Sequence, residues 1–79
     1  MRLDKYLKVS RIIKRRTVAN EACDAGRVSI NGKVAKAGTE VKVGDIIEVV
    51  FGNKTVKAEI IRIQESTKKE EAAEMFKYI

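Results

Sequence analysis

Residues 2–36 read RLDKYLKVSRIIKRRTVANEACDAGRVSINGKVAK, and their pattern predicts a helix, a turn, a second helix and a hairpin in that order. The same stretch carries most of the charge. Ten basic and three acidic residues give residues 1–36 a net charge of +7, whereas seven basic and eight acidic residues give residues 37–79 a net charge of −1. A polyanion is the partner that such segregated positive charge favours.

The first predicted helix separates an apolar stripe from a basic one. Leu3 and Leu7 stand four residues apart, while Arg2, Lys5 and Lys8 follow one another at intervals of three. On a helix these spacings place each set along its own face. The apolar face is expected to pack into the domain and the basic face to remain exposed.

Asp4 falls in the first turn of this helix. There a carboxylate complements the helix dipole and can pair with a neighbouring cation. Direct contact with the amine of a nucleobase is the second interpretation, and the sequence leaves both open.

Residues 10–16 are predicted to form the interhelical turn, which ends in Lys14-Arg15-Arg16. Thr17 is a plausible N-cap for a second helix that continues to about Ala25, with Gly26 as the C′ residue. Unpaired N–H groups at the start of that helix would lie beside the three cations. Backbone amides, helix dipole and side chains could then converge on a phosphate.

An antiparallel sheet is expected after the helices. Residues 27–34 alternate in polarity around Asn31-Gly32, and both of these residues tolerate the positive φ angles of a type I′ turn. Apolar runs at 46–51 and 56–63, separated by Gly52-Asn53, predict two further strands. Near the end, Thr67-Lys68-Lys69-Glu70 fits a capping box.

The residues after this capping box, Ala72, Ala73, Phe76 and Ile79, fit one helical stripe that either packs on the domain or receives a partner. With 79 residues the chain is expected to form one small α+β domain. We place the main domain at residues 1–66 and a C-terminal helical extension at 67–79.

Several classes of function are disfavoured by composition. The chain has no histidine and one cysteine, Cys23, which excludes an intramolecular disulfide, disfavours a metal site and removes the usual general base. Cys23 is interpreted as a small buried residue of the second helix. We therefore expect no catalytic residue, metal or cofactor. No apolar run approaches the roughly 20 residues of a membrane span, and the chain is expected to be cytoplasmic.

One ordered set of residues resembles the RNA-binding domain first recognised in the fourth small-subunit ribosomal protein, the S4 domain, which has the alpha-L fold. The set covers about residues 1–50 and consists of Arg2-Leu3-Asp4, Leu7, Arg11, Arg15-Arg16, Ala19, Gly26-Arg27-Val28, Asn31-Gly32, Lys36 and Gly44-Asp45. The resemblance implies that two packed helices and the following hairpin are set against structured RNA. Over nearly its whole length the chain also resembles the stand-alone S4-domain proteins of bacterial ribosome-associated quality control.

This second resemblance implies a ribosomal role. Such proteins bind large ribosomal subunits obstructed by peptidyl-tRNA, contact rRNA and tRNA near the P site, and support C-terminal tailing of the stalled peptide by an RqcH-type factor. It implies a ribosome-associated protein, expected to be monomeric and to have no membrane partner.

The candidate RNA-binding residues come from two sources. The S4 motif assigns RNA contact to Arg2, Asp4, Lys5, Arg11, Arg15, Arg16, Asn31 and Lys33. The charge pattern adds Lys8, Lys14, Arg27 and Lys36.

Other functions stay open at this point. One is the ribosome-recycling role of the related heat-shock S4 proteins, and another is an RNA-targeting module for an enzyme on another chain. Binding to DNA or to an anionic membrane is disfavoured, because the sequence shows no identifiable base-reading helix and only a weak apolar face.

Overall fold

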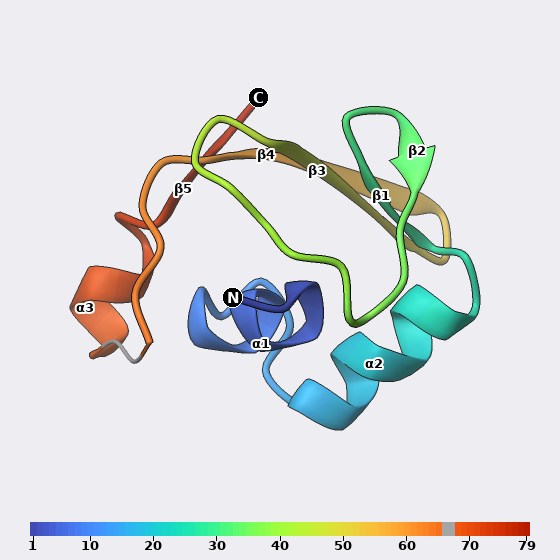
Figure 1. Ribbon diagram of the computed structural model, residues 1–79, viewed down its shortest axis with the longest axis horizontal. Helices are drawn as coiled ribbons and strands as arrows, with labels where there is room; N and C mark the ends of the chain where they lie inside the picture. The colour runs from blue at the N-terminus through green and yellow to red at the C-terminus, as the bar shows by residue number, and fades with distance from the viewer. Residues whose placement is uncertain (66–67) are drawn as a thin grey trace.

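The computed structural model of the protein describes residues 1–65 and 68–79. In these residues an antiparallel sheet of five strands, in the order β2-β1-β3-β4-β5, lies over two packed helices (Figure 1). The elements are α1 (Leu3–Val9), α2 (Arg16–Asp24), β1 (Val28–Ile30), β2 (Lys33–Val34), β3 (Ile46–Phe51), β4 (Lys54–Ile60), α3 (Lys69–Ala72) and β5 (Phe76–Tyr78). The predicted α+β class, with two N-terminal helices and an antiparallel sheet, is confirmed.

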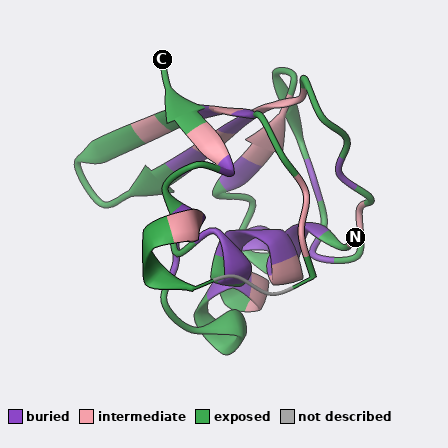
Figure 2. Ribbon diagram, turned by 90° about the vertical axis from the view of Figure 1, so that its left-hand side faces the viewer, coloured by how far each residue is buried: buried purple, intermediate pink, exposed green. Residues whose placement is uncertain are grey.

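The core lies between α1 and the inner face of the sheet, and Figure 2 shows α1 largely in the colour of buried residues. Leu3 and Leu7 are fully buried, as the apolar stripe predicts. Tyr6 is also fully buried, and its hydroxyl donates a hydrogen bond of 2.7 Å to the carbonyl oxygen of Met75. The first helix is thereby joined to the last turn before β5, which fixes its basic face relative to the C-terminal segment.

The second helix ends as expected but begins differently. Gly26 has φ +74°, and the N–H groups of Gly26 and Arg27 donate to the carbonyls of Cys23 and Ala22. These two bonds form a Schellman C-cap. The prediction of Thr17 as N-cap is wrong: α2 begins at Arg16, the N-cap residue is Arg15 with an extended backbone, and its side chain makes no capping hydrogen bond.

Small residues let α2 approach α1. Ala19 is fully buried and Cys23 is 3% exposed, which confirms the interpretation of Cys23 as a buried residue. Burial, assisted by the nearby charges of Asp4 and Asp24, raises the pKa of the Cys23 thiol to about 11. The thiol is therefore protonated at neutral pH and is a poor nucleophile.

The loop between β2 and β3 closes over the start of α1. The N–H groups of Leu3 and Asp4 donate to the carbonyls of Thr39 and Ala37 at 2.7 and 3.2 Å, and the N–H of Val41 donates to the carbonyl of Met1 at 3.0 Å. Backbone carbonyls of the loop thus supply the acceptors that the first turn of a helix lacks. These hydrogen bonds fix the position of the chain around Arg2.

The hairpin of β1 and β2 has the predicted two-residue turn. Ile30 pairs with Lys33, and Asn31 and Gly32 have φ angles of +52° and +85°. The Asn31 side chain also braces the next strand, because its Oδ1 accepts from the N–H of Ile46 at 3.0 Å and its Nδ2 donates to Asp45 at 3.1 Å.

The C-terminal segment departs from the predicted helix. Thr67 of the expected capping box lies outside the described residues, and Lys68 is the N-cap of the four-residue α3. The helical stripe through Phe76 and Ile79 is wrong, because Phe76–Tyr78 form β5 and pair with β4. Met75 is fully buried in the core, so this segment packs into the same domain. Hydrogen bonding to an open sheet edge has outweighed helix propensity here.

Candidate nucleic-acid interface

A basic groove runs between α1, the interhelical turn, the start of α2 and the C-terminal segment. Six cationic residues line it, together with Val9 and Glu65: Lys5, Lys8, Arg11, Lys14, Arg16 and Lys69. We refer to the groove lined by these eight residues as the basic groove. Cations concentrated along a concave surface raise the local concentration of an anionic partner.

Two residues of the interhelical turn, Ser10 and Ile13, are buried and leave its cations exposed. Ile13 is 5% exposed, and its N–H donates to the carbonyl of Leu7, whereas Arg11 and Lys14 are exposed. Arg11 adopts φ +64°, a left-handed conformation that reverses the chain after α1. The buried isoleucine fixes the turn, and the two flanking cations therefore face the groove.

Arg16 stands at the junction of the basic groove with a shallow depression lined by Asp4, Thr17, Asn20 and Glu21. It is the first residue of α2, and the side chain of the N-cap residue Arg15 makes no capping hydrogen bond. The first N–H groups of an uncapped helix are free to receive an anion. Side chain, amides and helix dipole therefore point to the same kind of ligand.

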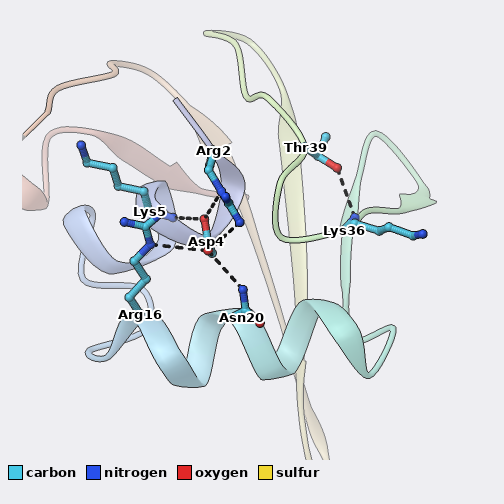
Figure 3. Close-up of polar contacts among 7 residues, drawn as sticks. All are labelled: Arg2, Asp4, Lys5, Arg16, Asn20, Lys36 and Thr39. Atoms are coloured by element: carbon cyan, nitrogen blue, oxygen red, sulfur yellow. Dashed lines mark hydrogen bonds and ion pairs between the residues drawn. The ribbon is translucent and has the colours of Figure 1, made fainter.

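Asp4 holds two arginines at this place (Figure 3). Its Oδ1 lies 3.2 Å from Nε of Arg2, and its Oδ2 lies 3.4 Å from Nε of Arg16. The Asn20 amide donates to Oδ2 at 3.3 Å, and the backbone N–H of Lys5 donates to Oδ1 at 2.8 Å. The Asp4 side chain is 3% exposed, whereas those of Arg2 and Arg16 are 55% and 47% exposed.

This geometry bears on the two interpretations of Asp4. Burial raises the pKa of the Asp4 carboxyl, but hydrogen bonds from Asn20, Arg16 and the Lys5 backbone outweigh burial, so the pKa is lowered from its ordinary value. The carboxylate is buried and already accepts from protein donors, which favours the interpretation in which Asp4 pairs with neighbouring cations. Its contact with RNA stays a prediction. Its cation partners, in contrast, remain half exposed and available.

Asp4→Asn is expected to destabilise the fold by about 1–3 kcal/mol, because a buried charged acceptor is lost from several donors. The folded-state pKa of Asp4 is lowered, so its contribution is present above the ordinary value near 3.8 and is lost as pH falls through the folded value. The thermal midpoint of the wild type should therefore fall more on acidification than that of the variant. The exposed Asp24→Asn, with the same change of charge, serves as control, and equal midpoints for both variants would contradict the role assigned to Asp4.

The remaining predicted residues lie outside the basic groove. Arg15 is exposed at the N-cap of α2, and the cations of the hairpin region, Arg27, Lys33 and Lys36, are exposed as well. The backbone N–H of Lys36 donates to the Thr39 hydroxyl, which leaves its ammonium outside this contact (Figure 3). The Asn31 side chain is used within the protein, as described above.

Sequence reasoning missed Asn20, Glu65 and Lys69. Asn20 carried a usable signal, because it lies four residues after Arg16 and thus on the same face of α2. Lys69 and Glu65 carried none, since they reach the groove through the fold of the C-terminal segment.

Residues 1–65 and 68–79 contain neither a metal-binding cluster nor a membrane-spanning helix. No group of three or more Cys, Asp or Glu side chains is arranged there to hold a metal ion. Within the same ranges no helix has the length and apolar character needed to cross a bilayer.

Comparison with known proteins gives the family. Residues 1–47 match the model of the S4 domain. The chain is 57% identical over 79 residues to the RQC P-site tRNA stabilizing factor of Streptococcus pneumoniae, covering all of this chain and 90% of the relative. A heat shock protein 15 homolog of Aeromonas salmonicida is 31% identical over 75 residues, covering 95% of this chain and 57% of that protein.

The fold agrees with a solved structure. Heat shock protein 15 of Vibrio cholerae superposes with a TM-score of 0.92 at 29% identity, covering all of this chain and 81% of that one. The S4 match spans both helices, the hairpin and the start of β3, and the full-length identity extends through α3 and β5. The chain therefore belongs to the S4-domain family and, within it, to the family of RQC P-site tRNA stabilizing factors, the RqcP proteins.

Proposed function

We propose that the protein binds rRNA and tRNA on large ribosomal subunits obstructed by peptidyl-tRNA. It stabilises the P-site tRNA there and supports C-terminal tailing of the stalled chain by an RqcH-type factor. The observation that carries this proposal is the basic groove of six cations in a chain 57% identical to a P-site tRNA stabilizing factor. The protein acts as a monomeric, cytoplasmic, ribosome-associated binding factor and not as an enzyme.

Two kinds of RNA contact are needed for this function, one to phosphates in general and one that recognises an obstructed subunit. Lysines and arginines on one surface recognise phosphates, which orient the protein but discriminate little between RNA particles. Selectivity for an obstructed subunit therefore requires a second contact that exists when peptidyl-tRNA is present. The hairpin cations and Arg15, which lie outside the groove, are available for it.

Large subunits that carry peptidyl-tRNA should bind the protein about 5- to 150-fold more tightly than empty ones, which corresponds to a coupling of roughly 1–3 kcal/mol. By linkage, the protein should slow loss of the tRNA from the particle. The measurement is sedimentation of the tagged protein with the two kinds of purified subunit. Equal binding to both, together with undiminished tailing in a deletion strain, would contradict the proposal.

Ribosome recycling of the heat-shock type is a second candidate function, supported by the close superposition on heat shock protein 15. The relative named for tRNA stabilisation is 57% identical, against 31% for the heat shock homolog, and this difference favours the first function. Purification of the tagged protein from cells separates the candidates. Obstructed large subunits support tRNA stabilisation, free small subunits support the recycling function, and a co-purifying enzyme would indicate a targeting module instead.

A further inference from the structure

One acidic side chain, Glu65, stands among the cations of the basic groove. It is the one anion among the described residues that line the groove, and its carboxylate forms an ion pair with the ammonium of Lys5. The Glu65 side chain is 78% exposed and that of Lys5 is 34% exposed. The groove that faces RNA in the proposed function thus already contains an anion.

Carboxylate and phosphate oxygens accept from the same donors. An ammonium paired with Glu65 offers less positive charge to a phosphate, and the carboxylate repels that phosphate at the same time. The side-chain hydrogen bond from Lys5 and its charge lower the pKa of the Glu65 carboxyl, so the competing anion is present throughout the neutral range.

The location of Glu65 allows it to move aside without loss of structure. Glu65 lies in the segment that follows β4. Hydrogen bonds hold this segment at its start, where the N–H groups of Ile61 and Arg62 donate to the carbonyl of Met75 at 2.8 and 3.0 Å. The exposed carboxylate can leave Lys5 by rotation of its side chain. Because exposed ion pairs contribute little to stability, the exchange has a small cost.

We propose that Glu65 occupies a phosphate position of the basic groove and competes with the RNA backbone for Lys5, which makes it a residue that sets the affinity of the groove. RNA replaces an internal anion at this position instead of filling an empty one. This inference deepens the proposed function and rests on it.

Glu65→Gln tests the inference in the full-length protein. We expect it to bind purified large ribosomal subunits carrying peptidyl-tRNA about two- to fivefold more tightly than the wild type at about 0.1 M salt, because it removes one exposed ion pair and one repulsive charge. Glu48→Gln is the control. It makes the same change of charge on β3, on the sheet face opposite to the buried Ile47 and Val49, and should leave binding unchanged.

A double-mutant cycle with Lys5 makes the test specific. In a Lys5→Met background, Glu65→Gln should give a clearly smaller gain in affinity, because only the repulsion between carboxylate and phosphate is left to remove. An equal gain from Glu48→Gln, a gain from Glu65→Gln that is undiminished without the Lys5 ammonium, or weaker binding by Glu65→Gln would each overturn the inference. Failure of the proposed function looks different, because wild type and Arg16→Ala would then bind these subunits equally.

Discussion

Arg16→Ala is expected to weaken association with large ribosomal subunits strongly while the thermal midpoint stays nearly unchanged. Arg16 begins α2, lines the basic groove, and is half exposed beside the uncapped helix N-terminus. Loss of one charge-assisted hydrogen bond to phosphate costs about 1.5–3 kcal/mol, which lowers affinity by about 10- to 150-fold. The fold should tolerate the change because Asp4 keeps Arg2, Asn20 and the Lys5 N–H as donors.

The matched control is Arg62→Ala. Arg62 is similarly exposed and also pairs with a carboxylate, that of Glu74, but it does not line the basic groove. Sedimentation with purified subunits measures binding, and thermal unfolding measures stability. If Arg16→Ala unfolds the protein, or if both variants lose binding equally, Arg16 is not the phosphate contact that we assign.

Raising the salt concentration from about 50 to 200 mM should weaken binding to large subunits by roughly 60- to 1,000-fold. Each phosphate neutralised contributes about 0.7–0.9 to the slope of log affinity against log salt, and neutralisation of four to six groove cations gives a slope of about 3–5. The measurement is a titration at several salt concentrations.

Arg16→Ala should reduce this slope by about one unit, whereas Arg62→Ala should not. A flat response in the wild type would show that phosphates are not the main target of the groove.

Local chemistry decides which parts of the fold are predictable from sequence. The Asn31-Gly32 turn and the Gly26 cap need positive φ angles that few residues adopt, so they can be recognised without knowledge of the rest of the chain. The start of α2 and the stretch around Phe76 are different. At the start of α2, Thr17 is a good capping residue, yet the helix begins one residue before it. Around Phe76 the spacing of apolar residues also fits a helix, and packing of Met75 and pairing with β4 select a strand after α3.

The candidate site divides in the same way. Lys5, Lys8, Arg11 and Lys14 could be assigned to one surface because helix spacing and one short turn place them. The burial of Asp4 could not be predicted, since it depends on how closely α2 approaches α1 and on donors from both helices. Lys69 could not be predicted either, because a segment more than fifty residues away in the sequence brings it to the groove.

Photocrosslinking from two exposed threonines tests the central claim most directly. Thr17 follows Arg16 in α2, whereas Thr55 lies on β4 with its side chain on the sheet face opposite to the buried Ala58 and Ile60. A photoreactive residue placed at either position removes no cation. With large subunits carrying peptidyl-tRNA, we expect crosslinks to RNA from position 17 and none above background from position 55. Crosslinks from position 55 alone would place RNA on the sheet and contradict the account.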